Sequence, residues 1–201
     1  MCIDIGGNKG FYTDIILKNF PNCKIIIFEP SKTNFEILEE KFKSKNVTIE
    51  KLAISKTAGI TTLYSNEDGS GLASLTKRRL DHFGIEFSMT ESITSVCFEE
   101  YWHNELNKQH IEFCKLDIEG HELEALEGFG EALKNIDFVQ FEFGGCNIDT
   151  KTSFQDFWYF FQKNEFEIYR ISPLGPIRIN SYEEQDESFK YSNYVAKRKL
   201  L

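Results

Sequence analysis

The first stretch of the chain that could do chemistry is a glycine-rich run beside two acids. Asp4 follows a short apolar segment, and Gly6, Gly7 and Gly10 come directly after it. Glycine lacks a Cβ, so the backbone there can turn sharply and approach a ligand closely. Glu29 ends the next apolar run, about twenty residues further on, where a carboxylate can accept hydrogen bonds from both hydroxyls of a ribose. This spacing predicts a βαβ unit that holds a nucleoside cofactor.

Ionisable residues gather a second time in the middle of the chain. Lys115 and Asp117 close an apolar run, with Glu119 and His121 just beyond it. Glu142 closes the next apolar run. Carboxylates at adjacent strand ends repel one another, which raises the pKa of at least one and favours its use as a general base. Lys115 shares a strand face with Asp117 and could hold a carboxylate ionised.

Hydrophobic periodicity predicts the elements that must position these residues. Apolar runs predict strands at residues 3–5, 25–28, 47–54, 60–64, 94–98, 111–116, 138–143, 166–171 and 191–197. Apolar residues at helical spacing predict helices at residues 11–20, 32–42, 99–106, 123–133 and 154–161. The aromatic stripe of the last helix is assigned to the core. Residues 65–74 are expected to form a surface loop, and residues 76–83 either a weak helix or a mobile lid.

Strands that alternate with helices indicate an open, mostly parallel sheet. The last two strands have no helix between them, only a loop with Pro173, Gly175 and Pro176, which suggests one antiparallel strand. In such sheets ligands bind outside the carboxyl ends of the strands. The two groups of candidate residues are therefore expected at one edge of the sheet.

Composition excludes several classes of function. A net charge of -9 argues against a nucleic-acid backbone as the main partner, and we interpret Lys77-Arg78-Arg79 as a solvated surface. No apolar run has the twenty or so residues that a membrane helix needs. The five cysteines are odd in number, have no metal-like spacing and fit a reducing cytoplasm. The four histidines form no zinc pattern with them, so we predict no metal site.

The chain begins directly at the first predicted strand. We therefore expect an N-terminal element that would cover the sheet to be absent, either because the protein is short or because the chain is a fragment of a longer one.

Several motifs together resemble S-adenosylmethionine-dependent methyltransferases of the FkbM family. The run Asp4-Ile5-Gly6-Gly7-Asn8-Lys9-Gly10 is similar to the first motif of that family, and Phe28-Glu29-Pro30 to its second. Lys115-Leu116-Asp117-Ile118-Glu119-Gly120-His121-Glu122 resembles its most characteristic stretch. Phe141-Glu142-Phe143 and Ser192-Asn193-Tyr194-Val195-Ala196 also resemble it, so the likeness spans nearly the whole chain. One departure is Gly7, where the family more often has alanine, a change we expect to be harmless in a turn.

The resemblance implies a Rossmann-like class I methyltransferase fold. This would be an α/β domain over residues 1–201, with an open seven-stranded, mostly parallel sheet, one antiparallel strand and helices on both faces. The implied cofactor is S-adenosyl-L-methionine, with Asp4 oriented toward its methionine end, Glu29 holding the ribose and Ala53 and Ile54 lining the adenine. The residues expected to bind the cofactor are Asp4, Gly6, Gly7, Asn8, Gly10, Phe11, Glu29, Pro30, Ala53, Ile54 and Asp117. Asp4 and Glu29 could instead merely cap the helices that follow them.

A hydroxyl is a poor nucleophile until its proton leaves, so an O-methyltransferase benefits from a general base near the methyl group. Asp117 is our first choice for base or substrate orienter, with Glu119, Lys115, His121 and Glu142 as further candidates. Glu119 could equally belong to the acidic first turn of the next helix, whose dipole favours acids. The same carboxylates could instead hold a divalent ion that lowers the pKa of a hydroxyl, although no fixed spacing requires one.

Three functions remain open from the sequence. The first is an O-methyltransferase acting on a hydroxyl of a small molecule or glycan, such as a surface-polysaccharide sugar. Its acceptor contacts are expected from residues 65–95, 144–152 and 172–190. The second is an NAD-type oxidoreductase, disfavoured because the turn is Gly6-Gly7-x-x-Gly10 and not Gly-x-Gly-x-x-Gly. The third is a non-catalytic cofactor-binding module.

Overall fold

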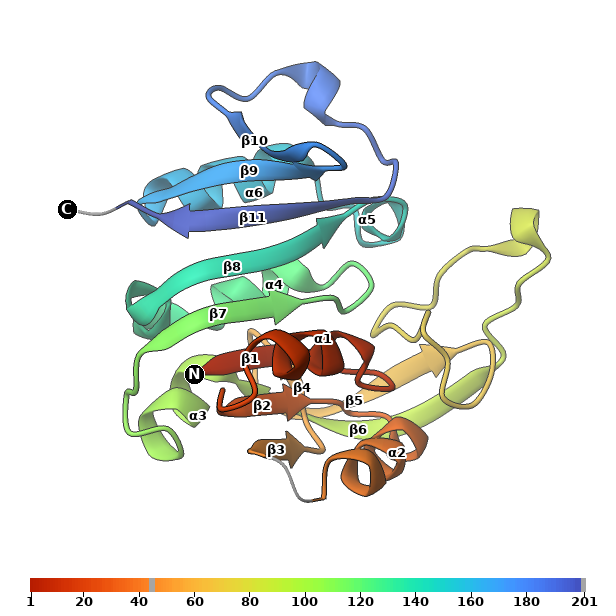
Figure 1. Cartoon of the computed structure of the whole chain (residues 1–201). Helices are drawn as coiled ribbons and strands as arrows, with labels where there is room; N and C mark the ends of the chain where they lie inside the picture. The colour runs from red at the N-terminus through yellow and green to blue at the C-terminus, as the bar shows by residue number, and fades with distance from the viewer. Residues whose placement is uncertain (44–45, 200–201) are drawn as a thin grey trace.

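The computed structural model describes residues 1–43 and 46–199 and is built on an eight-stranded sheet (Figure 1). Its strands are β1 (Cys2–Ile5), β2 (Ile25–Phe28), β3 (Val47–Glu50), β7 (Ile111–Leu116), β8 (Ile136–Phe143), β9 (Phe166–Ser172), β10 (Gly175–Ile179) and β11 (Ser192–Arg198). They lie in the order β10-β9-β11-β8-β7-β1-β2-β3. β8, β7, β1, β2 and β3 pair in parallel, whereas β11 is antiparallel to both of its neighbours. The predicted open, mostly parallel sheet is confirmed.

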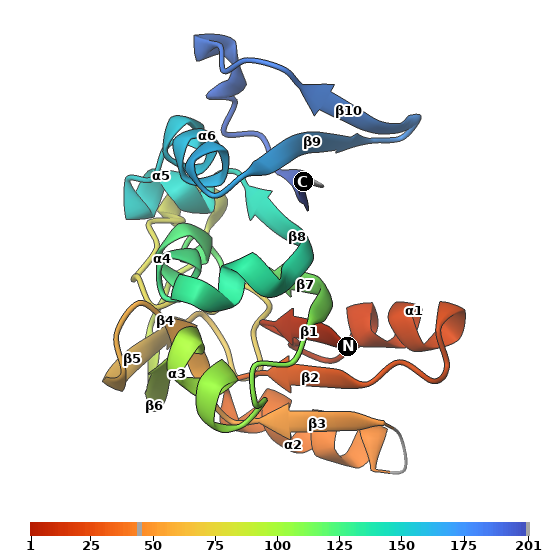
Figure 2. The same cartoon turned by 90° about the vertical axis from the view of Figure 1, so that its left-hand side faces the viewer.

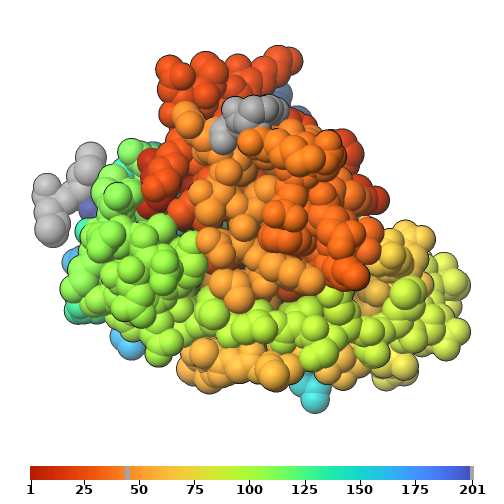
Figure 3. Space-filling model, turned by 90° about the horizontal axis from the view of Figure 1, so that it is seen from below, coloured from red at the N-terminus to blue at the C-terminus, as the bar shows by residue number. Residues whose placement is uncertain are grey.

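A smaller sheet lies at the carboxyl ends of the parallel strands. It contains β4 (Ala53–Ser55), β5 (Gly59–Ser65) and β6 (Met89–Cys97) in the order β4-β6-β5. Seen from below, β6 and the helix that follows it lie against the β3 edge of the main sheet (Figure 3). This second sheet gives the carboxyl edge of the main sheet an opposing wall.

Helices cover both faces of the main sheet (Figure 2). α1 (Phe11–Asn19) and α2 (Lys32–Phe42) pack on one face, and α3 (Phe98–Asn104), α4 (Glu122–Glu127) and α6 (Phe154–Lys163) on the other. Short elements complete the list: α5 (Cys146–Thr150) and the 3-10 turns η1 (Asp81–Phe83), η2 (Gly130–Asn135) and η3 (Glu184–Asp186). β2 shows why its apolar run is continuous: Ile25 and Ile27 face α1 and α2, while Ile26 and Phe28 face the opposite core.

The larger core is aromatic. Phe141 of β8 is fully buried, and its ring stacks on Phe157 and Phe161 of α6 at centroid distances of 4.8 and 5.0 Å. Tyr194 of β11 stacks on the same ring at 5.5 Å. The aromatic stripe of α6 is therefore core packing, as predicted.

Replacing Phe141 by leucine is expected to lower the free energy of unfolding by about 1–2 kcal/mol, because the ring contacts are lost and a small cavity remains. Chemical denaturation measures the change. Tyr159→Leu on the exposed side of α6, where the side chain is 63% exposed, is the matched control. Equal effects of both substitutions would contradict the assignment of Phe141 to the core.

The structure corrects four of the sequence predictions. The main sheet has eight strands and not seven, because β10 forms where a loop with Pro173, Gly175 and Pro176 was expected. β10 is an edge strand, so the missing N–H of Pro176 is tolerated. The single strand predicted at 47–54 is divided between β3 and β4, which belong to different sheets. The strand predicted at 94–98 begins earlier, as β6. Of residues 76–83, for which the sequence leaves a weak helix or a mobile lid open, only η1 is helical.

Candidate functional site

A cleft lies between the carboxyl ends of β1, β2 and β7 and the second sheet. The space inside it that can hold water-sized molecules is about 60 Å³, so the cleft is narrow in this structure. Twenty residues line it: Ile5, Gly6, Asn8, Phe28, Glu29, Pro30, Asn34, Leu52, Ala53, Ile54, Leu63, Ser70, Gly71, Ala73, Ser74, Leu75, Asp117, Ile118, Glu119 and His121. The two groups of candidate residues thus meet at one edge of the sheet, as the parallel topology requires.

The glycine turn brings the chain close to the end of β7. Gly6 has φ +79, and a Cβ at this position would lie 2.0 Å from the backbone oxygen of Asp117. Only glycine combines this conformation with such a close approach. Asn8 follows, also with a positive φ, and its backbone N–H points at Glu29. The turn therefore holds the ends of β1, β2 and β7 at fixed distances from one another.

Glu29 is held in place by backbone donors and still faces the cleft. Its two carboxylate oxygens accept the N–H groups of Asn8 at 2.8 Å and of Ser31 at 2.9 Å, one to each oxygen. Burial raises the pKa of Glu29 to about 7, although these two amides and the Asn34 side chain oppose the shift. Each carboxylate oxygen has a further acceptor position. Glu29 can thus stabilise the start of α2 and bind a ligand at the same time.

The lower part of the cleft is apolar. Ala53 and Ile54 of β4 line it, together with Leu52 and Leu63. Pro30 contributes from the end of β2. The surface is suited to a flat, weakly polar ring such as a purine. Ala53 and Ile54 were predicted at this place, whereas Leu63 comes from β5, whose position depends on the second sheet.

The opposite end of the cleft is charged. Asp117 follows β7, and its Oδ2 lies 3.1 Å from the Nζ of Lys115. The ammonium group of Lys115 is 3.6 Å from Asp4 on the other side. Burial lowers the pKa of Lys115, but Asp4 and Asp117 outweigh it, so the net shift is upward. Lys115 is therefore charged and pairs with Asp117, as the sequence predicted.

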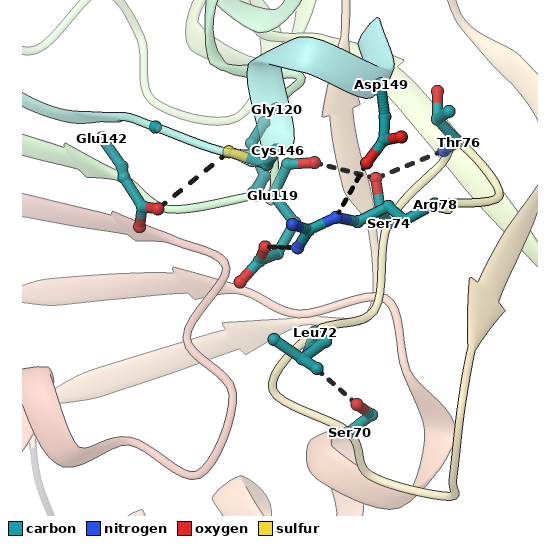
Figure 4. A network of polar contacts seen from close by, with 12 residues as sticks. Ser70, Leu72, Ser74, Thr76, Arg78, Glu119, Gly120, Glu142, Cys146 and Asp149 are labelled. Carbon is teal, nitrogen blue, oxygen red and sulfur yellow. Dashed lines mark hydrogen bonds and ion pairs between the residues drawn. The ribbon is translucent and has the colours of Figure 1, made fainter. Parts of the chain in front are cut away.

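Glu142 lies beside Asp117 and has a raised pKa. Burial and the nearby Asp117, Glu119 and Glu122 raise the pKa of Glu142 to about 9, and a hydrogen bond with Asp117 contributes to the shift. Glu142 is therefore protonated at neutral pH and donates to the Asp117 carboxylate. Its other neighbour is the Cys146 thiol, with the sulfur 4.0 Å from Oε1 (Figure 4). The repulsion predicted for adjacent carboxylates thus falls mainly on Glu142.

The residues beyond Asp117 differ in what they can do. Glu122 is fully buried and its carboxylate accepts the N–H groups of Ile118 and Gly120, so it fixes the shape of the loop. His121 lines the cleft, but its Nε2 lies 3.0 Å from the Thr76 hydroxyl and its Nδ1 2.9 Å from Glu124. Both ring nitrogens already have protein partners, so the geometry does not favour His121 as the base.

A protein-family model matches most of the chain. The model of the methyltransferase FkbM domain matches residues 4–178. The chain belongs to the FkbM methyltransferase family. No curated protein matches it. A solved structure of the methyltransferase domain of bacterial CtHen1-C is 10% identical, with a TM-score of 0.51, and the alignment covers 99% of this chain and 89% of that one. Precorrin-6y C5,15-methyltransferase from Geobacter metallireducens GS-15 is 9% identical, with a TM-score of 0.48 and coverages of 98% and 79%.

This FkbM methyltransferase therefore has the class I methyltransferase fold and uses S-adenosylmethionine as its methyl donor. The residues of the cleft fit that cofactor. Asn34 is 1% exposed and lines the cleft, and its Oδ1 has no hydrogen-bond donor among the described residues. A buried acceptor without a partner costs free energy, which a hydroxyl or amino donor of the nucleoside would remove. We expect Glu29 and Asn34 to hold the ribose.

Four residues expected to bind the cofactor do not line the cleft of this FkbM domain. Asp4 is fully buried, where it accepts the Thr13 hydroxyl at 2.7 Å and pairs with Lys115. Gly7 and Gly10 face the core. Phe11 is 71% exposed on α1, with the ammonium group of Lys41 over its ring. Any effect of Asp4 on a ligand is therefore indirect, through Lys115.

Two of these positions show why the turn needs glycine. A Cβ at Gly7 would lie 2.2 Å from Cγ2 of Ile27, and a Cβ at Gly10 would lie 2.5 Å from the Phe42 ring. Ile27 is β-branched and held in the sheet, so it cannot move aside easily. Alanine at Gly7 would therefore crowd Ile27 in this chain, and the glycine found there avoids that contact.

The FkbM motifs did not reveal Asn34, Arg78 or the cleft lining from residues 70–75. Asn34 is the third residue of α2, five residues after Glu29. Its position on the helix was the sequence signal that could have placed it beside Glu29. Among the described residues, the group Glu99, His103 and Glu131 could hold a metal ion, but none of the three lines the cleft. No helix in the described ranges has both the length and the apolar character required to span a bilayer.

Proposed function

We propose that this FkbM methyltransferase transfers the methyl group of S-adenosylmethionine to a hydroxyl oxygen of a small molecule or glycan, with a sugar as the acceptor. The observation that carries the proposal is the position of Asp117. It lines the cleft as a carboxylate beside the buried ammonium group of Lys115. A carboxylate at the charged end of the cleft is the base that a hydroxyl acceptor needs.

The cofactor supplies an electrophilic methyl carbon on a sulfonium. The acceptor oxygen forms a bond to that carbon as the carbon–sulfur bond breaks, and the proton of the hydroxyl goes to Asp117. Lys115 pairs with the Asp117 carboxylate at 3.1 Å and helps to fix its position, and Glu142 forms a hydrogen bond with the same side chain. The chain thus provides orientation and a proton acceptor.

Charge supports an acceptor without phosphate groups. The carboxyl side chains of Asp117 and Glu119 line the reactive end, and the whole chain carries a net charge of -9. A nucleic-acid backbone would be repelled there. All five cysteines are free thiols, which supports a location in the reducing cytoplasm.

The test is a screen for turnover with the purified chain and S-adenosylmethionine. Free sugars and oligosaccharides are compared with the same compounds whose hydroxyls are already methylated, with amines and with RNA. The expected result is formation of S-adenosylhomocysteine together with one added methyl group on an oxygen of a sugar. Methylation of nitrogen, carbon or RNA alone would refute the proposal. So would binding of the cofactor without turnover of any hydroxyl compound, because a non-catalytic module gives that result.

A further inference from the structure

Residues 70–79, which we call the strap, cross the cleft from the second sheet to the loop after β7. On one side, the Ser70 carbonyl accepts the Asn8 side chain at 3.3 Å, and Ser74 exchanges both backbone hydrogen bonds with Tyr64 of β5. On the other side, the Ser74 hydroxyl donates to the Glu119 carbonyl at 2.9 Å. Five residues between 70 and 75 line the same cleft as Glu29 and Asp117. A nucleoside in the cleft therefore lies under the strap.

Arg78 anchors the far end of the strap. Its guanidinium group lies between two carboxylates, with a short contact to Glu119 and with Nε 3.4 Å from Oδ2 of Asp149 (Figure 4). The three side chains are only 8%, 15% and 13% exposed. Asp149 lies on α5 and also accepts the backbone N–H of Arg79 at 3.3 Å. Arg78 thus connects the strap to the loop after β7 and to α5, which both belong to the main-sheet side of the cleft.

The inward position of Arg78 is unexpected from the sequence. Lys77-Arg78-Arg79 was interpreted as a solvated surface, and Lys77 and Arg79 are indeed exposed. Of the three, only Arg78 turns inward, toward Glu119 and Asp149. A planar guanidinium group with several donors can hold two carboxylates at once, which a lysine ammonium group cannot do with the same geometry.

Glu119 gives a second, independent reason to regard this contact as functional. It is a non-glycine residue with φ +55, a conformation that the surrounding structure must maintain. The strap holds it at two points, through Ser74 on its carbonyl and Arg78 on its carboxylate. The strap and the loop after Asp117 therefore depend on each other.

We propose that Arg78 is the latch of the strap, a positioning residue that holds the cleft closed over the nucleoside part of S-adenosylmethionine. The cofactor enters and leaves when Arg78 releases Glu119 and Asp149. The latch acts on access to the cleft and makes no contact with the cofactor. This proposal depends on the binding of S-adenosylmethionine and does not depend on the chemistry of the acceptor.

Stopped-flow binding of S-adenosylhomocysteine to Arg78→Gln tests the proposal. Both the association and the dissociation rate constants are expected to rise by about 10-fold or more, because entry and exit both wait for the strap to open and the strap opens more often without the Arg78 contacts. Their ratio, Kd, is expected to change by less than about 3-fold, since the latch opens for entry and exit alike. Lys77→Gln and Arg79→Gln remove the same charge from exposed neighbours and should leave both rates unchanged.

Two further variants keep the test decisive if Arg78→Gln proves unstable. Asp149→Asn removes one of the two carboxylates and should raise both rates by less than Arg78→Gln does. Arg78→Lys keeps the charge and should restore them in part. Rates equal to those of the unmodified chain in all three variants would overturn the proposal. A faster dissociation with an unchanged association rate would also overturn it, because that pattern belongs to a residue that contacts the cofactor. Binding itself remains measurable whether or not the acceptor is a sugar, so this result is separable from the proposed function.

Discussion

Replacing Asp117 by asparagine is expected to lower kcat by about 100-fold or more, because general-base catalysis contributes at least that much. The Kd of S-adenosylhomocysteine is expected to change by less than about 3-fold, since the amide keeps the shape of the side chain and loses only its basicity. Turnover is measured with the acceptor found in the screen, and Kd by calorimetric titration. A loss confined to kcat is the signature of a group that acts in the transition state.

The physical reason lies in the partners of the carboxylate. An asparagine oxygen can still accept from the Lys115 ammonium group, 3.1 Å away from Oδ2 in the structure, but it cannot take a proton from a hydroxyl. The substitution also removes one of the charges that raise the pKa of Glu142. Glu142 therefore ionises at lower pH in this variant. Any residual activity is expected to rise with pH as Glu142 loses its proton and can act as base.

Asp137→Asn is the matched control. Asp137 begins the same strand that Glu142 ends, is 43% exposed and pairs with His110 at 2.9 Å, at the opposite edge of the sheet. The same chemical change there should leave kcat unaltered. Normal turnover by the Asp117 variant would remove Asp117 from the catalytic role and leave the proposed base unassigned. A loss of cofactor binding equal to the loss of turnover would make Asp117 a binding residue only.

Apolar periodicity predicted the main sheet well because its central strands are buried on both faces. β2 reads as a continuous apolar run, and β1 and β7 are mostly apolar, interrupted by Asp4 in β1 and by Glu112 and Lys115 in β7. Each of the three ends at the acid or turn that forms the cleft. The run at 47–54 also looks continuous, yet the chain leaves the sheet after Glu50 and joins another at Ala53. Hydrophobicity records burial and not the sheet in which a residue is buried. The same limit hid β10, whose residues are mostly half-exposed or exposed at an edge.

Some residues of the site could be placed from the sequence, and others could not. Gly6, Glu29 and Asp117 could be found because a strand end fixes where each one lies. Asn34 reaches the cleft through a helix face, and Arg78 reaches the cleft-lining Glu119 through a crossing segment, so both placements depend on tertiary structure. The direction of the Asp4 side chain could not be read from the sequence either. A strand-end acid can point to either side of the sheet, and here it faces α1, where it accepts the Thr13 hydroxyl and pairs with Lys115.

Glu29→Gln is expected to weaken S-adenosylhomocysteine binding by about 30- to 100-fold at pH 8, because hydrogen bonds to a charged acceptor are stronger than those to a neutral one. An ionised carboxylate can accept two ribose hydroxyls in addition to the amides of Asn8 and Ser31. A glutamine side chain places an NH₂ group where one of those oxygens was. This group is a donor, so it cannot accept the backbone N–H or the ribose hydroxyl that the oxygen accepted. Calorimetric titration measures the change. Glu36→Gln, on the exposed side of α2, is the matched control.

The pH dependence of binding provides the sharper test. Burial raises the pKa of Glu29 to about 7, so in the free protein the carboxyl is protonated below that pH and ionised above it. A ribose whose hydroxyls donate to the Glu29 carboxylate binds the ionised form better. Affinity should therefore be constant above pH 7 and should fall below it, by up to about tenfold per pH unit, as proton and ligand compete. Glu29→Gln cannot titrate and should abolish this slope. Glu119 and Glu122 also have pKa values raised to about 7, so an unchanged slope in the variant would assign the titration to one of them and remove Glu29 from ribose binding.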